Sequence, residues 1–210
     1  MPVPDLAAAV DAFIADLAEY EHSAIVINPY REAHLAENLR LYLMAMLRRR
    51  GRHVLLVGEA PGYRGCGLTG IPFSSGEIYQ RFDHPLLRRL ARHIEIRQVE
   101  SENTATMVWE YLEDKPLTPL FWNSFPFHPH NPGDPRSNRA PNAREIEFGI
   151  HFLRRLKDLY RPSVIAGIGN KGTLCARRAF PHKSIAAIRH PSFGGKADFV
   201  RGMDQLFKWE

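Results

Sequence analysis

Three polar side chains of this sequence stand next to apolar segments in a way that could support chemistry. Glu59 lies in a glycine-rich loop after the run Val54–Val57, Asn123 directly follows a second apolar run, and His190 begins a third loop. A carboxylate can activate water, an amide can distinguish one hydrogen-bonding edge from another, and an imidazole can donate to an oxygen that becomes negative. These residue types fit a site that binds a planar heterocycle and cleaves a bond to it.

The loop that carries Glu59 continues to residue 75 and contains Phe73. Its glycines allow close approach of the backbone to a ligand, and a phenylalanine ring can stack on a planar base. Taken alone, this segment also fits an ordinary glycine-rich turn that ends in a core phenylalanine. Asn123 and His190 taken singly fit a turn-capping amide and a hydrogen-bonded loop histidine, so it is their joint position after strands that favours a site.

The segments between these loops alternate between strand-like and helix-like patterns. Short apolar runs at 54–57, 117–122, 163–168 and 184–188 are typical of buried strands, and helical spacing occurs at 78–93, 142–159, 170–179 and 196–208. Apolar strands that alternate with helices predict a parallel sheet covered on both faces. We therefore expect a three-layer α/β/α fold with a central four-stranded parallel sheet, and chemistry just beyond the carboxyl ends of its strands.

The first fifty residues have a different pattern. Apolar positions recur at helical spacing over 5–20 and 31–49, and Arg48–Arg50 end the second segment, where the helix dipole favours cations. We expect residues 1–50 to be an N-terminal helical extension packed on a main unit of residues 51–210. Since 210 residues correspond to roughly one and a half average domains, the whole chain is expected to be a single structural domain.

Composition excludes several classes of protein. Hydrophobic residues make up 44% and charged residues 24% of the chain, as in globular proteins and unlike disordered ones. No apolar run approaches roughly 18 residues, and three aspartates precede the first arginine, so we expect no membrane span, no signal peptide and a cytoplasmic location. The net charge of +5 fits an anionic partner, although an arginine-rich composition alone would also produce it.

Four motifs, spread over roughly residues 53–208, occur in an ordered set. They are Gly-Glu-Ala-Pro-Gly at 58–62 with Gly-x-Pro-Phe at 70–73, Phe-Trp-Asn-Ser-Phe-Pro at 121–126 followed by Pro141 and Glu145, the strand and turn at 161–170, and His-Pro-Ser at 190–192. This set resembles the uracil-DNA glycosylase superfamily. The first motif is most similar to family 4, with some similarity to family 5. The resemblance implies that superfamily's fold and the excision of uracil from DNA.

The resemblance also implies which residues contact the base after it leaves the stack. Phe73 would stack on uracil, Asn123 would read its O4 and N3–H edge, and His190 would donate to O2 as the glycosidic bond breaks. The other residues expected around the base are Gly58, Ala60 and Tyr63, of which Tyr63 would exclude the methyl group of thymine.

A second group of residues is expected to contact the DNA backbone or the duplex. It consists of Arg64, Ser74, Ser75, Ser192, Phe193 and Lys196. Phe193 follows His-Pro-Ser, where the superfamily carries a wedge that fills the hole left by a flipped base. The alternative for Phe193 is that it turns inward and packs beneath the sheet.

The sequence departs from the family in ways that bear on mechanism. Its only cysteines are Cys66 and Cys175, whereas family 4 binds an iron–sulfur cluster through four, so we expect no cofactor. Ala60 stands where the best-known members carry a catalytic aspartate, which leaves water activation to Glu59, to backbone carbonyls or to charge on the substrate. We favour Glu59 as the catalytic partner of His190. The expected pocket positions include no lysine, so hydrolysis without a lyase step is predicted.

The function expected is that of a monomeric, monofunctional uracil-DNA glycosylase of base excision repair. Its expected partner is uracil-containing DNA, and no interaction with a membrane is expected. The alternative is a member of the same superfamily that binds or covalently traps uracil-DNA without turnover. A dinucleotide-binding oxidoreductase is a remote alternative, because Gly167–Gly172 has G-x-G-x-x-G spacing but no acid follows before Asp198 to bind a ribose. His128 and His130 lack an evident third ligand, so no metal is expected.

Overall fold

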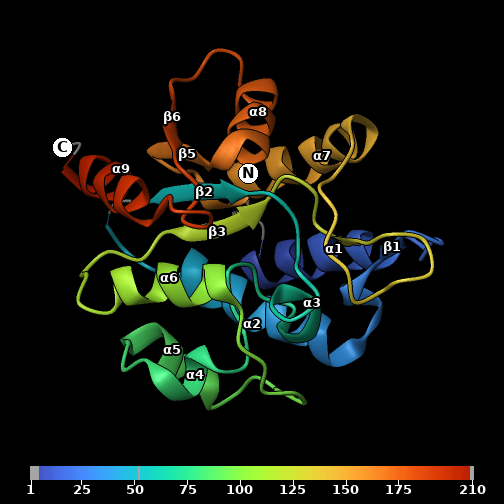
Figure 1. The fold of residues 1–210 in the computed structure, drawn as a ribbon. Helices are drawn as coiled ribbons and strands as arrows, with labels where there is room; N and C mark the ends of the chain where they lie inside the picture. The colour runs from blue at the N-terminus through green and yellow to red at the C-terminus, as the bar shows by residue number, and fades with distance from the viewer. Residues whose placement is uncertain (1–4, 52, 209–210) are drawn as a thin grey trace.

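The computed structural model describes residues 5–51 and 53–208. Its centre is a sheet of four parallel strands, β2 (Val54–Gly58), β3 (Leu120–Asn123), β5 (Val164–Ile168) and β6 (Ile185–Ile188), in the order β3-β2-β5-β6 (Figure 1). Every residue of β2 is buried, as expected for a central parallel strand covered on both faces. The predicted α/β fold with a four-stranded parallel sheet is therefore confirmed.

The register of the sheet brings the carboxyl ends of its strands to one edge. Gly58 at the end of β2 pairs with Asn123 at the end of β3, and Ile168 at the end of β5 pairs with Ile188 at the end of β6. Because all four strands run in the same direction, the loops after β2, β3 and β6 leave from this edge. Those are the loops that carry Glu59, Asn123 and His190.

Helices cover both faces of the sheet (Figure 1). The helices α7 (Ala143–Tyr160) and α8 (Gly169–Ala179) lie on one face, α2 (Ala33–Leu47) and α6 (Asn103–Leu112) lie on the other, and α9 (Lys196–Lys208) packs beside β6. The α8 helix approaches the sheet closely because Gly172 has no side chain, and a Cβ there would overlap the carbonyl oxygen of Val57.

The N-terminal helices share the core of the main unit. In α1 (Leu6–Ala18), the ring of Phe13 lies 5.5 Å from that of Trp122 in β3 and 5.8 Å from that of Phe152 in α7. The Tyr42 hydroxyl of α2 accepts a hydrogen bond of 2.8 Å from the Phe121 amide. Between these helices, β1 (Val26–Ile27) pairs antiparallel with β4 (His128–Pro129) and leads into the 3-10 helix η1 (Pro29–Arg31).

The prediction of one helix over 78–93 is wrong. The segment forms two short helices, α4 (Ile78–Arg81) and α5 (Pro85–Ala91), because Pro85 disfavours helical geometry in the residue before it, and His84 instead caps α5 through a hydrogen bond from the Leu86 amide. The helices α3 (Cys66–Thr69) and α6 were not predicted. No helix in residues 5–51 and 53–208 is long and apolar enough to cross a membrane.

Candidate active site

A cavity of about 380 Å³ opens at the carboxyl edge of β2 and β3. The loop after β2 forms one wall, and the start of α6, the segment 138–140 and the loop after β6 complete it. Its lining residues are Glu59, Ala60, Pro61, Gly62, Gly65, Cys66, Phe73, Ser74, Glu102, Asn103, Thr104, Asn123, Asn138, Arg139, Ala140, His190, Ser192 and Phe193. Side chains from segments far apart in sequence therefore converge at the predicted edge of the sheet.

Phe73 supplies an aromatic face at the end of β2. Its ring lies directly over Gly58, where an added Cβ would overlap ring atoms, and 4.9 Å from the ring of Phe121. The backbone of Phe73 has a positive φ of 55°, a strained geometry for a bulky residue, and the Trp109 indole holds it by donating to its carbonyl oxygen at 2.9 Å. The ring position is thus defined by the loop, by α6 and by the strand end.

Asn123 supplies an amide beside that ring. It is the last residue of β3, only 4% of its surface is exposed, and its Oδ1 lies 3.2 Å from the place where a Gly58 Cβ would stand. Its side chain has no hydrogen-bond partner within the described parts of the chain. Buried amides are normally hydrogen-bonded, so one at a cavity wall with no partner among the described residues is available to pair with a ligand.

His190 lies on the loop that follows β6 and is packed against Gly169, the first residue of α8. The Ser192 amide donates to His190 Nδ1 at 3.3 Å, so the neutral ring carries its proton on Nε2. Burial lowers the pKa of His190, the nearby Arg189 lowers it further, and Glu102 opposes both. The site therefore favours a neutral histidine that can donate one hydrogen bond from Nε2.

Glu59 contributes a carboxyl group to the same cavity. Burial raises its pKa above the usual value for glutamate, and the charge of Lys171 acts in the opposite direction. The backbone of Glu59 is fixed to the neighbouring strand, since its carbonyl oxygen accepts from the Ser124 hydroxyl at 2.6 Å and from the Phe125 amide at 3.1 Å. A positioned carboxylate with a raised pKa is suited to general-base catalysis.

Comparisons with known proteins agree with this arrangement. A sequence model of the uracil DNA glycosylase superfamily matches residues 47–201, well over half of the chain. The chain belongs to the uracil-DNA glycosylase superfamily. Among solved structures, the crystal structure of wild-type SMUG2 from Pedobacter heparinus is similar in fold, with a TM-score of 0.67, 16% identity, and coverage of 95% of this chain and 97% of that one. No curated protein matches the sequence.

Within this superfamily member, the residues predicted to surround uracil are divided between two cavities. Gly58 lies against Phe73 and Asn123, and Ala60 lines the same cavity as those two side chains. Tyr63, predicted to exclude thymine, lines a neighbouring cavity instead. Its amide donates to Oδ1 of Asn138, a residue that lines the first cavity, at 3.0 Å.

The predicted DNA contacts also divide into two groups. Ser74 and Ser75 are buried, with 2% and 0% exposure, because they sit beneath the loop, where the Ser74 hydroxyl bonds to Thr69 Oγ1 at 2.6 Å and to the Ile71 carbonyl at 2.8 Å. The Ser74 hydroxyl thus bonds within the loop even though Ser74 lines the cavity, and the buried Ser75 hydroxyl has no hydrogen-bond partner among the described residues, so neither is exposed for the expected phosphate contact.

The remaining predicted DNA contacts lie at the surface. Phe193 is 98% exposed with a φ of 53°, so the alternative that it packs beneath the sheet is wrong. Ser192 lies at the cavity wall, with its hydroxyl 3.5 Å from that of Thr104. Arg64 is exposed, and its guanidinium lies 4.0 Å from the Glu100 carboxylate. The Lys196 ammonium group pairs with the Glu110 carboxylate at 2.7 Å, so a phosphate would have to compete with Glu110 for Lys196.

Sequence reasoning missed Glu102, an acidic residue of the cavity wall whose charge acts to raise the pKa of His190. Glu102 caps α6 by accepting from the amides of Thr104 and Ala105 at 3.0 and 2.7 Å, and it packs against Gly65 in the cavity wall. An acidic cap is a recognisable signal for a helix start. The helix itself was hidden because Thr104, Thr106 and Val108 are β-branched residues with low helix propensity.

The two competing sequence signals have structural explanations. Both ring nitrogens of His128 contact backbone carbonyl oxygens, of Pro61 at 2.8 Å and Pro135 at 3.0 Å, and no metal-binding group of three His, Cys, Asp or Glu occurs in the described residues. Gly167, the first glycine of the G-x-G-x-x-G pattern, packs so closely on Thr173 that a Cβ would overlap it. The pattern therefore serves contact between α8 and the sheet.

Proposed function

We propose that this protein is a monofunctional uracil-DNA glycosylase that hydrolyses the N-glycosidic bond of uracil flipped out of DNA. The observation that carries the proposal is the buried Asn123 amide, which has no hydrogen-bond partner among the described residues and lies with Phe73 in the cavity that also contains His190. One aromatic face, one edge-reading amide and one hydrogen-bond donor are what recognition of a small planar base requires.

Recognition of uracil follows from the hydrogen-bonding pattern of an amide. Asn123 Nδ2 can donate to O4 of uracil while Oδ1 accepts from N3–H, and Phe73 stacks on the ring. Cytosine has a donor at C4 and an acceptor at N3, so both of these contacts would be mismatched in a largely buried site. The same Asn123 therefore explains selection of uracil over cytosine.

Cleavage breaks the bond between C1′ of the sugar and N1 of uracil. The electron pair leaves with the base, and His190 Nε2–H stabilises the negative charge that reaches O2. A water oxygen then bonds to C1′ while Glu59 accepts its proton. The neutral state of His190 suits this role, since its pKa is lowered by burial and the ring donates a hydrogen bond without requiring a positive charge.

The described residues place no free amine in the cavity wall, which supports hydrolysis without a lyase step. The described lining residues include no lysine. Lys171 donates to the Pro141 carbonyl at 3.1 Å, and Lys196 pairs with Glu110 outside the cavity wall. Formation of a Schiff base at C1′ would need an amine among the groups around the sugar.

The alternative is a protein that holds uracil-DNA without turnover, and Ala60 favours it, because this residue removes the usual aspartate from the first motif. An oligonucleotide with one uracil separates the two functions. Release of free uracil, with alkali-labile strand cleavage at that position, is expected of the enzyme. A stable retarded complex with no free uracil, even after prolonged incubation, would show that the protein binds and does not catalyse.

A further inference from the structure

A second cavity, of about 350 Å³, lies behind the loop that walls the candidate active site. Gly62, Gly65 and Cys66 line the active-site cavity, whereas Tyr63, Arg64 and Gly67 of the same loop line the second one. Consecutive Cα atoms are only about 3.8 Å apart, so neighbouring residues of one loop separate the two cavities. The two cavities therefore lie on either side of one loop.

The walls of the second cavity suit a flat ring. Tyr63 is half-buried there, and the Arg64 guanidinium lies 5.3 Å from the centroid of its ring. Ile27, Pro29 and Leu68 supply apolar surface. Aromatic rings and arginine planes flanked by apolar groups are the surfaces on which unstacked nucleobases pack in single-stranded complexes.

The rim of this cavity fits the backbone that such a base would carry. Arg64 and Arg136 are exposed at the rim, and the ion pair of Arg64 with Glu100 is long, at 4.0 Å, and solvent-exposed, so it is easily exchanged for a phosphate. Asn138 links the two cavities, since it lines the first and accepts a hydrogen bond from the Tyr63 amide.

We propose that the second cavity binds the base of the nucleotide adjacent to uracil, unstacked from its neighbours and stacked on Tyr63. The proposal rests on the function proposed above and adds a preference for single-stranded or locally unpaired DNA, because in a duplex the neighbouring base is held by its partner strand. It replaces the role of Tyr63 as a gate against thymine, since this residue does not line the cavity that contains Asn123.

The test uses single-stranded oligonucleotides in which a tetrahydrofuran abasic analogue replaces the base on the 5′ or the 3′ side of uracil. For the unmodified protein, one of the two replacements is expected to lower kcat/KM for uracil release about ten-fold, the loss that one stacked base produces. Tyr63→Ala should lower kcat/KM on the intact oligonucleotide by a similar factor and lose nothing further with the abasic analogue.

Tyr63→Phe is the matched control, because it keeps the ring and should retain the dependence on the flanking base. Uracil-over-thymine preference should be the same in all three proteins. The proposal is overturned if the flanking base has no effect, or if its effect survives in Tyr63→Ala. If no oligonucleotide releases uracil, the proposed function fails. The affinities of the same oligonucleotides for the same variants then test the subsite for the adjacent base independently of catalysis.

Discussion

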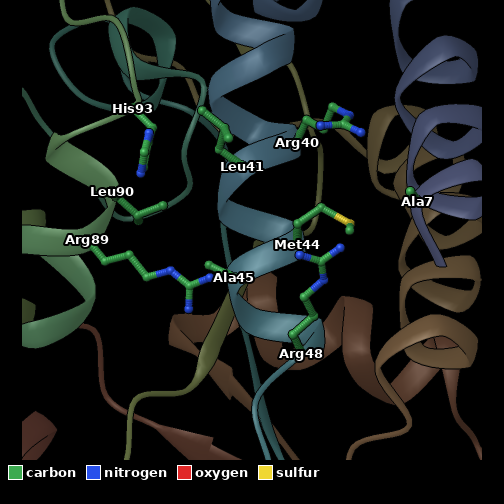
Figure 2. A pocket seen from close by; sticks show the side chains of 9 residues that line it. All are labelled: Ala7, Arg40, Leu41, Met44, Ala45, Arg48, Arg89, Leu90 and His93. Carbon is green, nitrogen blue, oxygen red and sulfur yellow. The ribbon is translucent and has the colours of Figure 1, made fainter.

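The candidate active site and a third cavity differ in how their polar groups are held. The candidate active site, of about 380 Å³, contains Asn123 at the end of β3 and His190 on the loop after β6. This third cavity, of about 280 Å³, lies between α1, α2 and α5, and its lining includes Arg40, Arg48 and Arg89 (Figure 2).

The difference shows why charge alone does not define a site. The arginines in Figure 2 extend from helix surfaces on long stems beside Leu41, Met44 and Leu90, and Arg40 already pairs with Asp11 at 2.6 Å. Ordering such side chains costs conformational entropy, and their stems cover apolar surface whether or not a ligand binds. Asn123, by contrast, has few rotatable bonds and is buried at a strand end, so its amide is oriented in advance.

The largest effect that would test this comparison is expected at Asn123. Asn123→Asp removes the donor to O4, and an ionised carboxylate would repel that oxygen, so kcat/KM for uracil should fall by about a thousand-fold or more. When the carboxyl is protonated, it presents a donor and an acceptor in the order that cytosine needs, so the preference for uracil over cytosine should also weaken. Excision assays on two oligonucleotides that differ only in carrying uracil or cytosine measure both the loss of activity and the change in preference. Full uracil activity with unchanged preference would show that Asn123 does not read the base.

The second-largest effect is expected at His190. His190→Ala removes the donor to O2, and loss of one such donor lowers kcat by about 100- to 1,000-fold. The change should appear in kcat under single-turnover conditions, with little change in affinity for uracil-DNA. A loss confined to affinity would instead indicate that His190 contributes to binding and not to bond cleavage.

Glu59 should determine the pH dependence of the reaction. A general base works only when deprotonated, and burial raises the pKa of Glu59, so activity should fall on acidification at a higher pH than an exposed glutamate would produce. Burial lowers the pKa of His190, which moves protonation of that ring toward lower pH, and the variant that follows separates the two groups. Glu59→Gln should reduce kcat by about 100-fold and remove the acidic limb of the pH–rate profile. An acidic limb that persists in this variant would assign it to another group.

Phe193 should have a smaller and substrate-dependent effect. A wedge keeps a flipped base from returning to the stack, so Phe193→Ala should lower activity on duplex uracil about ten-fold and change activity on single strands little. Because the side chain is 98% exposed, the melting temperature should not fall. Equal losses on duplex and single-stranded substrates would contradict the wedge.

The smallest effect is expected in the cavity of Figure 2. Replacing both Arg48 and Arg89 by glutamine should change uracil excision less than about two-fold, because neither residue lies on a loop at the carboxyl edge of the sheet. Arg64→Gln is the matched comparison, and it should reduce the salt dependence of binding to undamaged DNA by about one unit of slope, as expected for one phosphate contact. A similar reduction in the double variant would make the Figure 2 cavity part of the DNA-binding surface.

Much of the fold could be predicted because the relevant signals are local in sequence. The apolar runs that became β2, β3, β5 and β6, and the helical spacing of α7, α8 and α9, each lie within one segment. Once the strands are parallel, their carboxyl-end loops must share an edge, so the convergence of Glu59, Asn123 and His190 on one cavity followed from strand direction.

The positions of Tyr63, Ser75 and Phe193 were decided only by the tertiary structure. Tyr63 and Gly62 are neighbours in sequence but line different cavities, and the Tyr63 amide is bound by Asn138, far along the chain. Ser75 is buried beneath the loop, while Phe193 projects from a turn with positive φ. In a loop no residue period determines which side chain faces inward. The path of the backbone does, and contacts with distant segments such as the Trp109 bond to Phe73 set that path.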